Sequence, residues 1–292
     1  MNGILVIDKP VGWTSHDVVA KLRGALKVKR VGHGGTLDPM ATGVLPIFVG
    51  RATRAAEFCE SAEKEYITCL KLGIVTDTQD ITGATISACE ASVSTKDIES
   101  IVPRFLGPQK QTPPMYSAIK INGKKLYEMA RQGIDVPRPA RDIVISDIEL
   151  LGGSGDEFSL RIVCSKGTYI RTLCHDIGAL LGCGGVMSSL RRTRAGVFSI
   201  DAALTLDETL SAVSAGQTNT VMIPTDELFA GYPAITLSDT GARRCKNGAR
   251  CHVESISDGR YRFYGSGNEF LLLGDVISGE IKPIKSFFAP AK

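Results

Sequence analysis

The chain has 292 residues, of which 43% are hydrophobic and 22% are charged. These fractions are close to those of soluble globular proteins, so they exclude wholesale disorder and allow one large domain with a small one, or two medium domains. The net charge of +3 is too small to identify a partner.

An apolar run at residues 4–7 opens the chain and meets Asp8, followed by Lys9 and Pro10. We predict a short strand there. The run is too short for a secretion signal, and no apolar run in the sequence reaches the length needed to span a membrane. The expectation that follows is a cytoplasmic protein.

A helix is predicted next, because Thr14 and Ser15 suit its N-terminus and apolar residues then recur at helical spacing. A glycine-rich turn at residues 32–35 leads from this helix to Asp38, which precedes a proline. By pattern alone Asp38 is a turn residue. A rigid carboxylate beside a cation can instead act as a nucleophile, and His33 is either structural or functional. Both alternatives stay open here.

Helical patterns then cover residues 53–63 and 94–105, with a strand at 66–72 and a loop at 76–80 between them. Tyr66 opens this strand. Aromatic residues commonly pack across a sheet, so its simplest role is structural.

The net positive charge of the chain is concentrated in residues 110–141. They contain seven Lys or Arg and two acids, interleaved with two tyrosines and bracketed by prolines. This composition is typical of an arm that contacts phosphates, although a solvated loop and helix can share it.

Strands are predicted at residues 143–150 and 157–165, and a helix at 170–181 with Thr168 as its N-cap. Gly182 is its predicted stop. A cation in the first turn of a helix opposes the helix dipole, so Arg171 is a candidate for a role other than local stability.

The C-terminal third begins with a basic cluster at residues 191–194, which is predicted to precede a strand at 196–200. The small, polar residues 211–220 are predicted to be a flexible connector. Short strand-like runs with glycine turns follow, and they indicate a compact β-rich barrel of about 60 residues.

Eight cysteines are spread over the chain without a C-x-x-C pair, and they are expected to be reduced and mostly buried. Cys245, Cys251 and His252 could hold a metal with one further ligand, but their spacing fits no zinc module. Structural thiols are therefore the simpler interpretation. No P-loop or dinucleotide-binding glycine motif occurs either.

Five stretches of sequence carry a resemblance: residues 3–16, 31–46, 111–120, 167–173 and 190–193. The second contains the run Gly34-Gly35-Thr36-Leu37-Asp38-Pro39. Together and in this order, they resemble the opening, catalytic signature, RNA-clasping thumb and later active-site motifs of the tRNA pseudouridine-55 synthase family, the TruB type. The resemblance runs from about residue 3 to 200 and is weaker beyond.

The resemblance implies an α+β fold. Its catalytic domain, residues 1–229, has a mixed, largely antiparallel central sheet with flanking helices and an inserted thumb at about 110–141. Residues 230–292 are similar to the small β-rich RNA-binding PUA domain.

The resemblance also implies a role for each matching residue. Asp38 matches the catalytic aspartate, and Arg171 matches its partner. Tyr66 matches the tyrosine that stacks on the flipped base and is implicated in proton abstraction. Leu190 matches a residue lining the uracil pocket, and His33 one that supports the RNA loop. The thumb cations expected to contact RNA are Lys120, Lys124, Lys125, Arg131 and Arg141.

The implied reaction converts uridine 55 in the T loop of tRNA to pseudouridine by base flipping, cleavage of the glycosidic bond and reattachment through C5. Because this isomerisation involves no redox change and no group donor, neither a cofactor nor a metal is expected. The expected partner is the tRNA T stem-loop, without a membrane, a guide RNA or an obligate protein partner, and the expected state is a monomer.

Two other functions share features of this sequence. The guide-RNA-dependent branch of the superfamily has a similar Asp signature, but the thumb-like run and the short chain favour the stand-alone enzyme. A non-catalytic RNA-binding or tRNA-folding protein is the second alternative, and family members can assist tRNA folding by binding alone. The intact set of Asp38, Tyr66 and Arg171 favours an enzyme. The sequence leaves open whether Asp38 acts by a nucleophilic or a glycal route.

Overall fold

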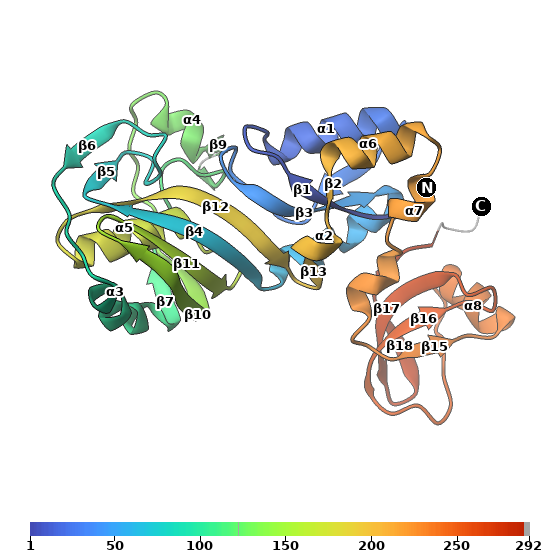
Figure 1. Ribbon diagram of the computed structural model, residues 1–292. Helices are drawn as coiled ribbons and strands as arrows, with labels where there is room; N and C mark the ends of the chain where they lie inside the picture. The colour runs from blue at the N-terminus through green and yellow to red at the C-terminus, as the bar shows by residue number, and fades with distance from the viewer. Residues whose placement is uncertain (122, 289–292) are drawn as a thin grey trace. The chain divides into compact units, whose positions relative to one another are not determined.

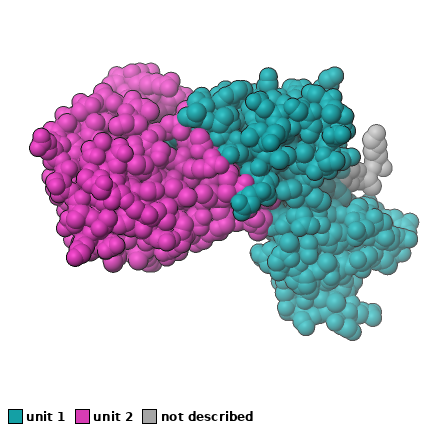
Figure 2. Space-filling view, in the orientation of Figure 1, with its two compact units in different colours: residues 1–38, 45–60, 201–292 teal, residues 39–44, 61–200 magenta. Residues whose placement is uncertain are grey.

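The computed structural model describes residues 1–121 and 123–288 (Figure 1). The chain forms two compact units, shown in Figure 2: unit 1 comprises residues 1–38, 45–60 and 201–292, and unit 2 residues 39–44 and 61–200. The predicted boundary near residue 230 follows the family's domains rather than these contacts, and it stays a prediction. Residues 289–292 of the predicted C-terminal domain lie outside the described residues.

The core of unit 2 is a mixed sheet. Its strands are β3 (Thr42–Val49), which continues into unit 1, β4 (Lys64–Leu72), β7 (Gly107–Gln111), β10 (Arg141–Ser154), β11 (Glu157–Cys164), β12 (Gly185–Ala195) and β13 (Phe198–Ser199). The order is β3-β12-β4-β11-β10-β7, with β13 beside β12. All pairs are antiparallel except β3 with β12. The predicted mixed, largely antiparallel sheet is therefore confirmed.

The basic cluster at residues 191–194 lies inside β12, so the prediction that it precedes a strand at 196–200 is wrong. The alternation of buried apolar and exposed polar residues that marks a strand is hidden in β12, because an arginine occupies one of its buried positions. Arg192 is only 1% exposed, and its Nε donates a hydrogen bond to the carbonyl oxygen of Val44 at 2.7 Å.

The described residues of unit 2 include the α-helices α3 (Thr95–Ile101), α4 (Leu126–Ala130) and α5 (Ile170–Leu180). The predicted α5 packs against β4 and β12 and stops before Gly182, which has a φ of 79°. Its N-cap is Tyr169, however, and not Thr168. The Thr168 hydroxyl is engaged elsewhere, because it donates to the carbonyl oxygen of Ser165 at 3.0 Å.

The segment between β7 and β10 leaves the sheet where Gln111 pairs with Arg141. It contains α4 and a small hairpin formed by β8 (Lys120–Ile121) and β9 (Lys124–Lys125). A second hairpin after β4 consists of β5 (Ile74–Thr76) and β6 (Thr85–Ala88), and the loop at residues 77–84 joins its two strands.

In unit 1 the strand order is β14-β1-β3, and β2 pairs with β3. The bounds are β1 (Gly3–Lys9), α1 (Ser15–Leu26), β2 (Val31–His33), α2 (Ala56–Ser61), β14 (Leu204–Thr205), α6 (Leu206–Ser214) and α7 (Thr218–Val221). The predicted first strand and first helix are confirmed. The helix predicted at 53–63 is a 3₁₀ turn, Gly50–Ala55, followed by the short α2.

The predicted connector at residues 211–220 is wrong, because α6 and α7 occupy it. Helix α6 starts at a capping box in which the Thr205 hydroxyl accepts from the backbone N–H of Glu208 at 3.2 Å, and the Glu208 carboxylate accepts from the N–H of Thr205 at 2.8 Å. This local signal outweighs the small, polar residues that follow.

The C-terminal part of unit 1 is a four-stranded sheet in the order β15-β16-β17-β18. Its elements are β15 (Ala234–Thr236), α8 (Asp239–Lys246), β16 (Gly259–Tyr264), β17 (Phe270–Ile277) and β18 (Glu280–Ser286). The sheet and α8 enclose a small apolar core of their own. The predicted β-rich C-terminus is confirmed, although the described ladders form an open sheet rather than a closed barrel.

Candidate active site

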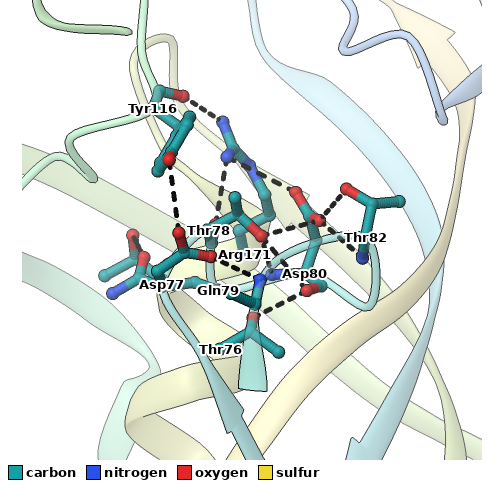
Figure 3. A network of polar contacts seen from close by, with 10 residues as sticks. Thr76, Asp77, Thr78, Gln79, Asp80, Thr82, Tyr116 and Arg171 are labelled. Atoms are coloured by element: carbon teal, nitrogen blue, oxygen red, sulfur yellow. Dashed lines mark hydrogen bonds and ion pairs between the residues drawn. The ribbon is translucent and has the colours of Figure 1, made fainter. Parts of the chain in front are cut away.

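Arg171 is the centre of a buried polar network at the start of α5 (Figure 3), where its side chain is 5% exposed. Its Nη1 donates to the carbonyl oxygen of Thr78 at 3.1 Å and lies 3.5 Å from the Oδ2 of Asp80. Its Nη2 donates to the carbonyl oxygen of Tyr116 at 2.8 Å. A carboxylate and two carbonyl dipoles thus stabilise and orient this cation.

The loop that provides Asp80 is itself fixed by side-chain hydrogen bonds. The Oδ1 of Asp80 accepts from the hydroxyl of Thr78 at 2.9 Å and from the backbone N–H of Thr82 at 3.0 Å. Gln79 has a left-handed φ of 63°, and its side-chain oxygen accepts from the hydroxyl of Thr172 on α5 at 2.7 Å. The loop and the first turn of α5 therefore hold each other in place.

Sequence reasoning treated residues 76–80 only as a loop and missed Asp80. A detectable signal was present in the Thr-Asp-Thr-Gln-Asp run itself: the Thr78 hydroxyl donates to the carboxylate of Asp80, and the Thr76 hydroxyl donates to its backbone carbonyl oxygen. Short hydroxyl side chains can satisfy a carboxylate locally.

The N-terminus of α5 is clamped by Gln111, a buried residue at the end of β7. Its Oε1 accepts from the backbone N–H of Tyr169 at 2.7 Å, and its Nε2 donates to the carbonyl oxygen of Tyr169 at 3.0 Å. Because Tyr169 is the N-cap of α5, this contact fixes where the helix starts, two residues before Arg171.

Tyr66 and Leu190 lie on neighbouring antiparallel strands, β4 and β12. Tyr66 is opposite Arg192, and Leu190 is opposite Thr68. Residues opposite each other share a face of the sheet, as do residues two apart on one strand, so both side chains lie on the same, buried face. The predicted ring and pocket residues are thus brought together.

Asp38 belongs to unit 1 and is half-buried, in the loop after β2. The backbone N–H of Gly34 donates to the carbonyl oxygen of Pro46 at 2.9 Å, and the N–H of Gly35 donates to Nδ1 of His33 at 3.3 Å. These bonds hold the turn that leads to Asp38.

Only glycine fits at position 34 of this turn. An added Cβ would lie 2.8 Å from both the Sγ of Cys59 and the ring of Phe48. The close approach of the backbone to α2 and β3 thus explains one glycine of the run. Since Asp38 and Arg171 belong to different units, their pairing stays a prediction.

The thumb cations are available at the surface. Lys120, Lys124, Arg131 and Arg141 are exposed, and Lys125 is half-buried. The Nζ of Lys125 and the guanidinium of Arg131 lie 5.3 and 5.4 Å from the centre of the Tyr127 ring. Contact of these residues with RNA remains a prediction.

Cys245 and Cys251 pack in the apolar core of the C-terminal sheet. Burial raises the pKa of the Cys245 thiol to about 11, and the Sγ of Cys251 donates to the carbonyl oxygen of Ala249 at 3.4 Å. Among residues 1–121 and 123–288, no three His, Cys, Asp or Glu side chains are grouped to hold a metal ion. No helix in the same ranges is long and apolar enough to cross a membrane.

Comparison with known protein families shows which family this chain belongs to. The profile of the TruB family pseudouridylate synthases, N-terminal domain, matches residues 23–170. The profile of the tRNA pseudouridylate synthase B C-terminal domain matches residues 171–230. The chain belongs to the TruB family of pseudouridine synthases. It is therefore an isomerase, and the resemblance seen in the sequence is confirmed.

Relatives match along most of the chain. It is 42% identical to the tRNA pseudouridine synthase B of Clostridium kluyveri, over 98% of this chain and 100% of that protein. It is 47% identical to the enzyme of the same name from Bacillus velezensis, over 85% of this chain and 83% of the relative. The relatives are therefore matched over nearly their whole lengths.

Solved structures confirm the fold. A crystal structure of a Cbf5-Nop10-Gar1 complex contains a chain that matches with a TM-score of 0.74 and 27% identity, over 98% of this chain and 85% of that one. A structure of an H/ACA RNP bound to a substrate RNA containing 2'-deoxyuridine matches with a TM-score of 0.75 and 25% identity, over 99% and 86%.

Proposed function

We propose that this protein converts uridine 55 in the T loop of tRNA to pseudouridine, with Asp38 as the catalytic carboxylate. Its identity of 42–47% to proteins named tRNA pseudouridine synthase B, against 25–27% to chains of Cbf5 and H/ACA complexes, favours a tRNA substrate over the guide-RNA-dependent alternative. The observation that carries the proposal is the buried, oriented guanidinium of Arg171.

In the proposed reaction, the target uridine leaves the folded T loop and enters a pocket, at a cost of a few kcal/mol. Tyr66 stacks on the flipped base and Leu190 lines its edge, a division of roles that suits two side chains on one buried face. His33 supports the RNA loop from which the base has been removed.

Asp38 then acts on the ribose or the base. A guanidinium beside a carboxylate favours its charged form, which is the form that attacks C1′ or C6, or that promotes deprotonation at C2′ toward a glycal. In each route the N1–C1′ bond breaks, the uracil rotates, and C5 joins C1′ and loses its proton. N1 gains a proton, and the bond or proton taken by Asp38 is returned. The proposal assigns that guanidinium to Arg171, whose orientation is fixed by Asp80 and two carbonyl groups.

Binding of the T stem-loop is assigned to the thumb cations and to the C-terminal sheet. The thumb presents cations beside the ring of Tyr127, a combination suited to phosphates and bases. The last turn of α8 adds Arg243, Arg244 and Lys246. The proposal includes activity as a cytoplasmic monomer without a guide RNA or cofactor, and assistance to tRNA folding through binding alone.

The test is conversion of an unmodified tRNA transcript by the purified protein, in the presence of a metal chelator and without added cofactor. Carbodiimide-based primer extension should reveal a new stop one nucleotide 3′ of position 55, which reports pseudouridine at that position. Asp38→Asn should bind the transcript without converting it, and a transcript with cytidine at position 55 should show no stop. Absence of this stop with the wild-type protein, or a stop that reports pseudouridine at another position, would refute the proposed substrate.

A further inference from the structure

The hydroxyl of Ser15 makes a two-way contact with a residue 22 positions away. Ser15 is the first residue of α1 and is 1% exposed. Its Oγ accepts from the backbone N–H of Leu37 at 2.9 Å and lies 3.2 Å from the carbonyl oxygen of Leu37, to which it donates. One side chain thus satisfies both buried polar groups of one residue, where no strand ladder does so.

Leu37 is the residue immediately before Asp38. Its carbonyl group belongs to the peptide unit that joins the two residues, and this unit is planar. A hydrogen bond to the oxygen therefore sets the orientation of the plane that contains the nitrogen and Cα of Asp38. The Leu37 side chain is buried as well, so the residue is anchored on both its polar and its apolar side.

The anchor is itself rigid. Thr14 and Asp17 form a capping box, with the Asp17 N–H donating to the Thr14 hydroxyl at 3.1 Å and the Thr14 N–H donating to the Asp17 carboxylate at 2.9 Å. The side chains of Val18 and Leu22, in the following turns of α1, are buried and anchor the helix. The Ser15 hydroxyl is therefore carried by a fixed helix, while the residues it holds lie in a loop.

We propose that Ser15 is the positioning residue for the carboxylate of Asp38. The proposal rests on the catalytic role proposed for Asp38. Ser15 fixes the peptide before Asp38, so that the carboxylate is presented to the flipped nucleotide in one orientation. Misplacement of a reacting group by about 1 Å costs on the order of a hundredfold in rate, so loss of this anchor acts on turnover rather than on tRNA binding.

The experiment compares Ser15→Ala with the wild type, Asp38→Asn and Thr209→Val. Thr209 is an equally buried residue of unit 1 and lies on α6. Its Oγ1 donates to the carbonyl oxygen of Thr205 at 2.9 Å. It is the matched control for the loss of a buried hydrogen bond away from the Asp38 loop. Conversion of a tRNA transcript is measured at saturating enzyme and in steady state, well below the melting temperature of every variant.

Ser15→Ala is expected to lower kcat by about tenfold to a hundredfold, with KM for tRNA unchanged within about twofold, while Thr209→Val keeps the wild-type kcat. Wild-type kcat in Ser15→Ala, with Asp38→Asn inactive, overturns the role of Ser15 alone. Equal losses of kcat in Ser15→Ala and Thr209→Val also overturn it, because the effect is then one of general stability. Activity in Asp38→Asn instead removes the proposed function.

Ser15→Cys provides the conservative variant, since its thiol places a polar atom at the same position, although it is larger than a hydroxyl and makes weaker hydrogen bonds. It is expected to show a kcat between those of the wild type and Ser15→Ala. If Ser15→Ala does not fold, Ser15→Cys replaces it. A wild-type kcat in a folded Ser15→Cys then overturns the proposal, and a reduced kcat with unchanged KM supports it.

Discussion

Replacing Asp80 with asparagine should weaken both the fold and the activity, because it removes a buried negative charge from a buried guanidinium. The side chains of Asp80 and Arg171 are 7% and 5% exposed, with 3.5 Å between Oδ2 and Nη1. At this distance, Coulomb's law with an effective dielectric constant of 20 gives an attraction of about 5 kcal/mol.

The net loss should be smaller than this attraction. Arg171 keeps the carbonyl oxygens of Thr78 and Tyr116 as acceptors at 3.1 and 2.8 Å. Removing one partner of a buried ion pair costs roughly 3–5 kcal/mol, and these remaining acceptors favour the lower end, about 3 kcal/mol. Catalysis should fall as well, by up to about a hundredfold in kcat, because the guanidinium loses one of the three acceptors that orient it.

The free energy of unfolding from urea titration and the single-turnover conversion of a tRNA transcript measure these two effects. Asp156→Asn is the matched control, because Asp156 approaches Lys71 more closely, at 2.7 Å, but its side chain is 45% exposed. Since water screens exposed pairs, this variant should be close to the wild type in stability and activity. Equal effects of the two substitutions would refute the argument that burial, rather than distance, decides the strength of the pair.

Three further predictions concern the backbone, the acid limb of stability and the thiols. Gly43→Ala should destabilise the fold by more than about 3 kcal/mol in thermal or urea unfolding, because its φ is 100° and a Cβ would overlap a backbone oxygen of β12. Gly12→Ala is the control: its φ is 83° but the space around it is open, so it should cost about 1 kcal/mol. Equal costs of the two substitutions would contradict the overlap. Hydrogen bonds from a serine hydroxyl and an arginine hold the pKa of Glu63 below its usual value of 4.5. The carboxylate therefore stabilises the fold fully above that value, and this stabilisation is lost as the pH falls through the lower folded pKa. The difference in unfolding free energy between the wild type and Glu63→Gln should shrink from pH 7 to pH 3, and a constant difference would refute this. Mass spectrometry after treatment of the native protein with iodoacetamide at pH 8 should show a labelled Cys89, which is exposed, and an unlabelled Cys174. Burial raises the pKa of the Cys174 thiol to about 12, so about one thiol in 10⁴ is ionised at this pH. Comparable labelling of the two cysteines would contradict this.

Elements whose signals lie within a few residues were predictable. Thr14 and the apolar spacing after it specified α1, because an N-cap and one buried face are local properties. The N-cap of α5 was misplaced by one residue, since Tyr169 is held by Gln111 from a distant strand, and no local pattern reports that contact. β12 was missed for a related reason: Arg192 finds its acceptor on Val44, far away in the sequence.

The candidate site divides in the same way. Asp38, Tyr66 and Arg171 were named because the motifs around them resemble a family, while spacing alone favoured structural roles for Asp38 and Tyr66. The residues that hold them escaped notice. Asp80 lies in a loop with no helical or strand pattern, and Ser15 appeared only as a helix start. Supporting hydrogen bonds join residues 22 to 93 positions apart, and a single sequence does not encode such pairs in any readable spacing.

The base of the thumb is also part of the Arg171 network, and this limits how the enzyme can be shortened. Gln111 clamps the start of α5, and the carbonyl group of Tyr116 accepts from Arg171. A deletion confined to residues 118–137 would remove the hairpin and α4 but keep both contacts. A deletion that starts at residue 112 would take an acceptor away from the guanidinium. A shortened form of this enzyme should therefore keep the first residues of the thumb, as far as Tyr116, even for an RNA that the thumb does not contact.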